Sequence, residues 1–148
     1  MKTTNHNSTQ NQHDDGFTLV ELLVVLAIIG LVATLVAPRV LNYLGSARVS
    51  TTQAQMNNIG SALELYYLDA GAYPTTEAGL EALVNAPAGA QNWNGPYLKS
   101  KSALVDAWGK AFHYEQSADG ARLFIKSLGR DGKQDGEGLD ADIIFKVH

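Results

Sequence analysis

The sequence contains no cysteine among its 148 residues. A disulfide framework and a thiolate metal site are therefore excluded, although the redox compartment of the protein is not revealed. Basic residues are also few, with 11 lysines and arginines against 15 acidic residues and a net charge of -4. Because no basic face stands out, nucleic-acid binding is not expected. A small domain without disulfides needs another stabilising element, and a bound metal ion is one candidate.

Signatures of catalysis are missing as well. His6 and His13 lie near the N-terminus, His113 alternates within a predicted strand, and His148 ends the chain. There is no nucleophile elbow, no glycine-rich phosphate loop followed by a helix, and no paired-histidine metal site. We therefore predict that the protein is not an enzyme.

The most prominent feature present is an apolar run over residues 17–37, whose one charged residue is Glu21. At a rise of about 1.5 Å per residue, a helix of this length crosses the roughly 30 Å hydrocarbon layer of a membrane. The polar residues 1–16 precede it and are expected to be disordered. Secretory signals are cut after their apolar run, but the one candidate processing residue here, Gly16, lies before it. Cleavage after Gly16 would remove residues 1–16 as a leader and keep the helix.

The stretch "GFTLVELLVVLAIIGLVATLVAP", residues 16–38, resembles the N-terminal signature of type IV pilins and type II secretion pseudopilins. The resemblance implies cleavage between Gly16 and Phe17 by a prepilin peptidase, which also methylates the new N-terminus of Phe17. It further implies a single span of the bacterial inner membrane, with a cytoplasmic N-terminus and a periplasmic C-terminal domain. Charge does not predict this orientation, because Arg39 and Arg48 follow the span.

Glu21 allows two interpretations. A carboxylate within a membrane is costly, so it indicates a function. Cleavage would create an amine on Phe17 in the same layer, and Glu21 of one subunit could pair with the amine of a neighbour, which would set the axial stagger of a filament. Alternatively, Glu21 extends to the lipid headgroups from a plain anchor, one turn into the helix.

The helix is predicted to continue past the membrane. From Pro38 to Asp69 there is no glycine pair and no second proline, and apolar residues recur at three- and four-residue steps. This stripe consists of Met56, Ile59, Leu63, Tyr66 and Ala70. We expect one helix of about fifty residues, with a membrane half over 17–37 and an amphipathic half over 38–70. Pro38, at the junction, should kink or loosen the helix.

The remaining residues, 71–148, are predicted to form a small globular part. The long helix should end at Gly71, and Thr75 or Thr76 should cap a short helix with Leu80, Leu83 and Val84 facing inward. Strands are expected within residues 106–116 and 121–129, joined by a turn at Asp119–Gly120, and within residues 142–147. The predicted class is therefore α+β.

The stretches "YPTTEAGLEALV", "GPYLK" and "DAWGKAFHY" resemble the G-type major pseudopilins of type II secretion. The resemblance implies a pilin-like fold, in which a long N-terminal helix packs on a small antiparallel sheet that carries a C-terminal calcium loop. It implies a structural subunit that polymerises into a short filament and drives protein export across the outer membrane. The implied partners are other copies of the chain, minor pseudopilins, the inner-membrane assembly platform and the prepilin peptidase.

Two alternatives remain to the secretion pseudopilin. The first is a type IV pilus subunit for adhesion or motility, although such pilins often carry a C-terminal disulfide loop, which this chain lacks. The second is a membrane-anchored calcium-binding protein that never polymerises. The processing motif and Glu21 argue against the second alternative.

The last candidate site is "SLGRDGKQDGEGLDADI", residues 127–143, which concentrates five acidic residues among glycines. These acids are Asp131, Asp135, Glu137, Asp140 and Asp142. Oxygen ligands at this density suit calcium, whereas zinc would require histidine or cysteine nearby. The spacing matches an EF-hand loop only in part, because Lys133 occupies a ligand position. A solvated acidic turn is the alternative.

The family resemblance implies a structural calcium ion in this loop. It assigns one ligand to the carbonyl oxygen of Leu128 and another to the carboxylate of Asp131. Asp140 and Asp142 are both candidates for a later ligand, with a slight preference for Asp140. Asp135 and Glu137 are second-tier candidates.

Overall fold

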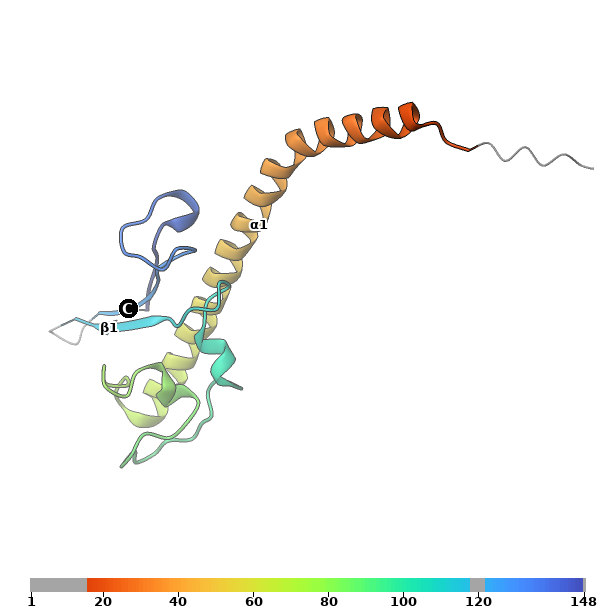
Figure 1. Ribbon diagram of the computed structural model, residues 1–148. Coiled ribbons are helices and arrows are strands. Elements are labelled where there is room, and N and C mark those ends of the chain that lie inside the picture. The colour runs from red at the N-terminus through yellow and green to blue at the C-terminus, as the bar shows by residue number, and fades with distance from the viewer. Residues whose placement is uncertain (1–15, 118–121, 148) are drawn as a thin grey trace, which may run out of the picture. The chain divides into compact units, whose positions relative to one another are not determined.

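A computed structural model describes residues 16–117 and 122–147 of the chain (Figure 1). The leader before Gly16, the predicted turn at Asp119–Gly120 and His148 lie outside the described residues. The elements follow the order α1, η1, η2, β1, β2, η3 and β3, where η marks a short 3-10 helix. By its contacts the chain divides into two compact units, Met1–Val40 and Leu41–His148.

Helix α1 (Leu19–Ala70) is continuous over 52 residues and includes Pro38. This confirms the predicted helix of about fifty residues. It ends where predicted, because Gly71 takes a left-handed backbone with φ of 75° and donates its N–H to the Tyr67 carbonyl oxygen at 2.8 Å. Glycine adopts that conformation without the steric cost that a Cβ would add.

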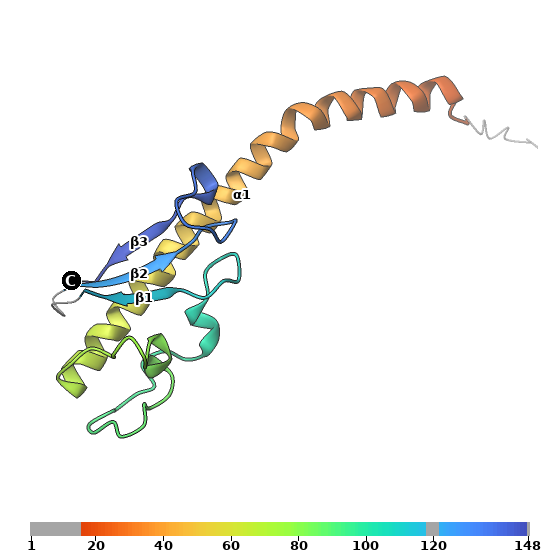
Figure 2. The same ribbon diagram turned by 60° about the vertical axis from the view of Figure 1, so that its left-hand side comes forward.

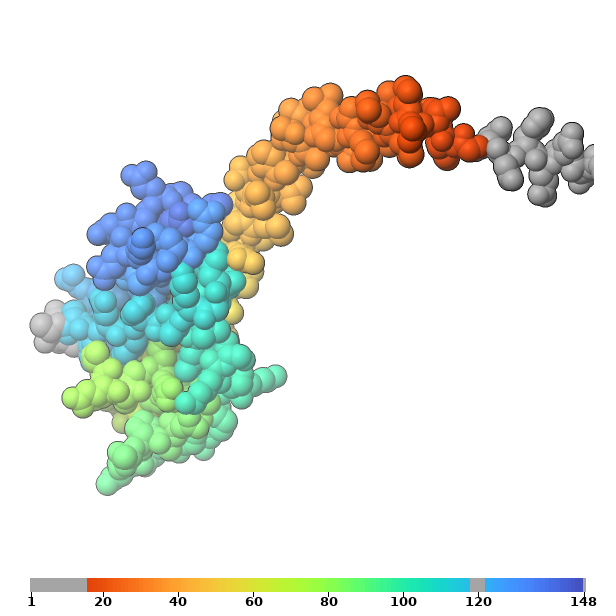
Figure 3. All heavy atoms as spheres, in the orientation of Figure 1, coloured from red at the N-terminus to blue at the C-terminus, as the bar shows by residue number. Residues whose placement is uncertain are grey.

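In the first unit, α1 is apolar and its side chains are exposed along the whole described length (Figure 3). This is the one helix among the described residues that is long and apolar enough to cross a membrane. An exposed apolar surface of this size requires lipid or protein to cover it.

In the second unit, the predicted stripe of α1 forms one side of the core. Met56, Ile59 and Leu63 are fully buried and Tyr66 nearly so, whereas Ala70 is half-buried. The other side consists of residues from the sheet and the preceding loops. These are Leu80, Leu83, Leu98, Phe112, Tyr114, Leu123 and Ile125. The stripe prediction is therefore confirmed for its central residues.

The sheet contains β1 (His113–Gln116), β2 (Leu123–Ser127) and β3 (Ile143–Lys146) in that order, and both strand pairs are antiparallel. Figure 2 shows the three strands side by side across α1. Tyr114 is paired with Ile125, which is paired in turn with Phe145. Since side chains alternate along a strand, this register directs all three toward the helix. Phe112, Tyr114, Leu123 and Ile125 are buried at alternate positions, as expected of the predicted strands.

The segment between α1 and the sheet contains η1 (Leu80–Leu83) and η2 (Lys101–Leu104). The Thr75 hydroxyl accepts the N–H of Ala78 at 3.2 Å, so this threonine closes the turn before η1. The predicted short helix is a 3-10 helix that begins at Leu80, and Leu80 and Leu83 face inward as expected. Trp93 donates its indole N–H to the Ala82 carbonyl oxygen at 2.9 Å, which fastens the following loop to η1.

Two leucines of α1 test this core. Leu63 is fully buried and Leu68 is 76% exposed. We expect Leu63→Ala to lower the free energy of unfolding by about 2–5 kcal/mol, because it leaves a cavity. Leu68→Ala, the matched control, should change it by less than about 0.5 kcal/mol. The fluorescence of Trp93 and Trp108, both in the second unit, reports the transition in detergent micelles. Equal losses for the two variants would contradict this core.

Candidate functional site

The start of α1 is capped by its own side chains. Glu21 Oε2 accepts the backbone N–H of Thr18 at 2.8 Å and the Thr18 hydroxyl at 2.9 Å. In return, Thr18 Oγ1 accepts the N–H of Glu21 at 3.2 Å. This reciprocal arrangement is a capping box, which satisfies backbone donors at a helix start. Glu21 thus has a partner in its own helix, Thr18. The sequence analysis did not predict this contact, although the Thr-x-x-Glu spacing indicates it.

The other residues of the predicted processing and assembly sites lie on both sides of this cap. Gly16 and Phe17 precede α1 without regular structure, and Phe17 is 79% exposed. A peptide bond in such exposed, irregular backbone is accessible to a peptidase. Pro38 lies within α1, and the helix continues without interruption there.

The acidic loop, defined here as residues 128–142, connects β2 to β3. Its glycines permit close backbone approach. Gly129 has φ of 64°, and a Cβ there would lie 2.7 Å from the Asp140 carbonyl oxygen and 2.8 Å from that of Ala141. A Cβ on Gly136 would lie closer still to the Asp140 carbonyl oxygen. The beginning and the end of the loop, here called its two arms, therefore meet where Gly129 has no side chain, beside the carbonyl oxygens of Asp140 and Ala141.

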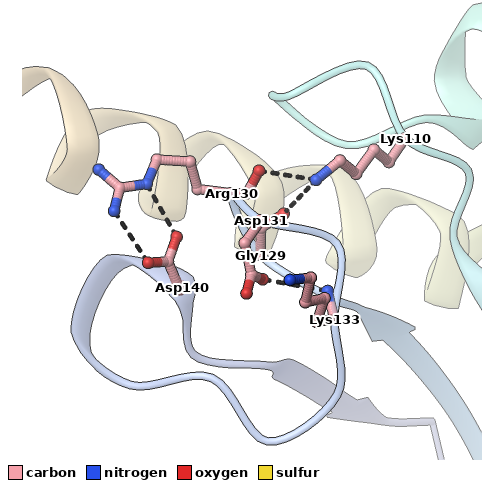
Figure 4. Close-up of polar contacts among 6 residues, drawn as sticks. All are labelled: Lys110, Gly129, Arg130, Asp131, Lys133 and Asp140. Atoms are coloured by element: carbon pink, nitrogen blue, oxygen red, sulfur yellow. Dashed lines mark hydrogen bonds and ion pairs between the residues drawn. The ribbon is translucent and has the colours of Figure 1, made fainter.

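The predicted ligands have separate partners in this loop. The Leu128 carbonyl accepts the N–H of Gly132 at 3.1 Å, and Asp131 Oδ1 accepts the N–H of Lys133 at 3.0 Å. Asp140 binds Arg130 through two bonds of 2.8 Å each (Figure 4). Within the described residues, no three histidine or acidic side chains gather as a metal-binding group.

Asp142 occupies a different environment from the other acids. Its Oδ2 pairs with Lys126 Nζ at 2.9 Å and accepts the N–H of Asp135 at 3.4 Å. Its Oδ1 is buried and has no hydrogen-bond partner within the described part of the chain. A buried carboxylate oxygen without a partner is energetically costly, and Asp142 Oδ1 is such an oxygen among the described residues of the loop.

The ion pairs shift the ionisation of these groups. The hydrogen bonds from Arg130 lower the pKa of Asp140, while partial burial opposes that shift, and Asp140 raises the pKa of Arg130. The hydrogen bond from Lys126 lowers the pKa of Asp142, and the same bond raises the pKa of Lys126. Both carboxylates therefore remain charged at neutral pH.

Second-unit residues outside the acidic loop hold its start in place. Asp106 is only 4% exposed, and its Oδ1 accepts the N–H groups of Trp108 and Lys110 at 2.9 Å each. Its Oδ2 accepts the Ser127 hydroxyl at 2.6 Å, and Ser127 Oγ accepts the N–H of Gly129 at 3.3 Å. Sequence reasoning missed this role. The signal was an aspartate at the first position of the turn Asp106–Gly109, where such side chains bond to the following backbone.

Comparison with known proteins identifies the family. A model of "Type II secretion system (T2SS), protein G" matches residues 39–146, and one of the "Prokaryotic N-terminal methylation motif" matches residues 11–37. The chain belongs to the protein G family of type II secretion systems. Core protein G of Pseudomonas aeruginosa is 41% identical over 90% of this chain and 96% of its own length. That of Vibrio cholerae is 39% identical over 86% and 88%.

The fold agrees with this family. The crystal structure of the major pseudopilin from enterohaemorrhagic Escherichia coli matches with a TM-score of 0.55 at 30% identity, over 67% of this chain and 86% of that one. The chain is thus a major pseudopilin of the type II secretion system, with a pilin-like fold, and a structural subunit instead of an enzyme. The recognition and the fold class predicted from the sequence are confirmed. The site residues and the calcium ion stay predictions.

Replacement of Asp106 tests the anchor of the acidic loop. Asp106→Ala would leave two N–H groups and the Ser127 hydroxyl without their acceptor. We expect the free energy of unfolding to fall by about 2–4 kcal/mol, measured by tryptophan fluorescence in denaturant. Asp106→Asn keeps one acceptor oxygen and should lose clearly less. Equal losses for the alanine and asparagine variants would contradict the hydrogen-bonding role.

Proposed function

We propose that this pseudopilin polymerises into a short periplasmic filament that drives protein export. The contact between subunits is made by the part of α1 that lies in the first unit. The observation that supports this proposal is the exposed apolar helix whose start is capped by the carboxylate of Glu21. Lipid covers this surface before assembly, and the same helix of neighbouring copies covers it afterwards. The membrane is the bacterial inner membrane, with the N-terminus cytoplasmic and the second unit periplasmic.

Processing precedes assembly in this proposal. The prepilin peptidase cuts between Gly16 and Phe17, removes residues 1–16 and methylates the Phe17 amine. Support comes from the N-terminal methylation motif and from the exposed, non-helical backbone at Gly16 and Phe17. The mature chain then interacts with the inner-membrane assembly platform and with minor pseudopilins. The match to a secretion family favours this role over a type IV pilus subunit.

Glu21 sets the register between neighbouring subunits in the proposed filament. Both hydrogen bonds that its carboxylate accepts from Thr18 use Oε2. Oε1 then accepts the Phe17 amine of the next subunit, and the capping box holds the carboxylate in place for this contact. In a medium of low dielectric such an ion pair is strong and position-dependent. Pro38 loosens the helix near the junction and lets the packed helices adjust.

Two substitutions of Glu21 separate capping from charge. Glu21→Gln retains a side-chain acceptor at the third helical position, where capping boxes also use glutamine, but removes the charge. We expect Glu21→Gln and Glu21→Leu to insert into the membrane normally and both to abolish filaments, as judged by shearing and electron microscopy. Filaments from Glu21→Gln but not from Glu21→Leu would assign Glu21 a capping role alone and would contradict the intersubunit pair.

We further propose that the acidic loop binds a structural calcium ion. The residues fit in three respects: Asp142 offers a buried oxygen without a partner, the carbonyls of Asp140 and Ala141 lie at the meeting point of the two arms, and Asp131 is exposed. Hard oxygen donors of this kind are the ligands calcium prefers. Asp131, Asp142 and the Leu128 carbonyl would hold the ion. Asp140 becomes a secondary candidate, because Arg130 already occupies both of its oxygens. Asp135 and Glu137 remain second-tier candidates.

The ion would neutralise the acids and join the two arms of the loop. Any ligand that binds the folded state alone stabilises it by mass action. Lys126 occupies one oxygen of Asp142, because its amine lies 2.9 Å from Oδ2. The free Oδ1 allows binding without loss of that pair. Magnesium, which requires stricter geometry and retains water, should bind far less well.

Calcium binding is tested by the melting temperature of the full chain in detergent. We expect calcium to raise it by several degrees relative to chelator, and magnesium to have little effect. Asp131→Ala and Asp142→Asn should each abolish most of this rise. Glu77→Gln, which neutralises an acid remote from the loop, should keep it. An unchanged melting temperature for the wild-type chain on addition of calcium would make the acidic loop a solvated turn.

A further inference from the structure

The acidic loop contacts α1 at Gly45, which lies within the second unit. Leu139 packs against Gly45 so closely that a Cβ on this glycine would lie 2.8 Å from Leu139 Cδ2 and 3.1 Å from its Cγ. Figure 3 shows the C-terminal segment, in blue, against this part of the helix. Such distances are shorter than ordinary contacts between carbon atoms. The missing side chain of Gly45 therefore makes the space that Leu139 occupies.

The same short element holds both Leu139 and Asp140. Helix η3 (Gly138–Asp140) places Leu139 on α1 and, one residue later, directs Asp140 to Arg130. The Arg130–Asp140 pair is bidentate, with both bonds 2.8 Å long. Planar, two-bond contacts between arginine and a carboxylate fix orientation as well as distance. Holding Asp140 thus holds Leu139 on the helix.

Arg130 is itself anchored through its backbone by Lys110, which lies outside the acidic loop. Its carbonyl oxygen accepts Lys110 Nζ at 2.6 Å, and the Gly129 carbonyl lies 3.4 Å from the same amine (Figure 4). The N–H of Lys110 is bound in turn by the buried Asp106 carboxylate. A continuous series of contacts therefore runs from the buried Asp106 through Lys110 and Arg130 to Asp140.

Charge explains why the loop needs such an anchor. Residues 128–142 contain five acids and two bases, Arg130 and Lys133, so the loop carries a charge of 2 − 5 = −3. Like charges this close repel one another and favour an open loop. Lys133 contacts Asp131 through its backbone N–H, and its side chain makes no ion pair with the described residues. Arg130 is thus the loop's own base that bonds across it.

We propose that Arg130 is a positioning residue that closes the acidic loop on α1 at Gly45 without a metal ion. Its bidentate bond to Asp140 provides the cross-link between the two arms that calcium would otherwise provide. The loop of this pseudopilin therefore stays docked when calcium is scarce, and calcium adds to a structure that is already closed. The calcium part of this inference rests on the proposed calcium site, whereas the closure by Arg130 does not.

Hydrogen exchange of the full chain in detergent tests this role. In chelator, Arg130→Gln should raise the exchange of amides in residues 136–142 on the order of five-fold, the upper range for a solvent-accessible pair. Lys133→Gln removes the same charge from the same loop and should exchange like the wild type. Calcium should restore slow exchange in Arg130→Gln, which a general folding defect would not allow. Slow exchange of Arg130→Gln in chelator would overturn the proposal.

The docking point is tested separately with two glycines of α1. Gly45→Ala should also raise exchange of residues 136–142, because its methyl group meets Leu139. Gly30→Ala is the matched control, since a Cβ there meets no atom within 4 Å. Unchanged exchange in Gly45→Ala would contradict docking at this point. If calcium alters neither the wild type nor Arg130→Gln while Arg130→Gln exchanges fast in chelator, the calcium site is rejected and closure by Arg130 stands.

Discussion

An apolar helix surface that the described part of the chain does not cover is the constraint on which this protein depends. In the first unit every described side chain of α1 is exposed, and burial of such a surface is worth about 25 cal/mol per Å². Neither water nor the other described residues provide that burial. The surface is therefore stable in lipid or against similar helices. These are the two environments that we propose for a pseudopilin subunit, before and after assembly.

The second unit solves a different problem with the same helix. Here one stripe of α1 is covered by a three-stranded sheet that is too small to bury a core by itself. The helix supplies Met56, Ile59 and Leu63 to that core. Hydrogen bonds connect the helix to the rest of the unit at the edge of the core. The Thr52 hydroxyl, fully buried in α1, accepts the N–H of Ala107 at 3.2 Å and ties the turn before β1 to the helix.

Without disulfides, the loops of this unit depend on side-chain bonds to backbone. Asp106 and Lys110 form one such set, and both act on the first residues of the acidic loop. Arg130 and Lys126 then neutralise individual acids of that loop. The acidic loop is thus held by cations of the chain itself, and the proposed calcium ion would complete this arrangement at Asp142.

Periodic and contiguous features of the protein follow from the sequence. The length of the apolar run, the stripe of α1, the stop at Gly71 and the alternation in β1 and β2 each depend on neighbouring residues and on a fixed helical or strand period. The motif from Gly16 to Pro38 and the stretches of the globular part were also sufficient to recognise the family. Even the capping box could have been predicted, since Thr18 and Glu21 are three residues apart.

Only the tertiary structure decided which charge meets which. Arg130 and Asp140 are ten residues apart, Lys110 and Arg130 lie on different segments, and Leu139 meets Gly45 across most of the unit. Composition predicted an acidic, glycine-rich turn but could not distinguish Asp140, with both oxygens bound, from Asp142, with one oxygen free. Such pairings depend on the backbone path through several left-handed glycines. A few degrees of rotation there move a side chain beyond hydrogen-bond range, and no sequence period encodes that rotation.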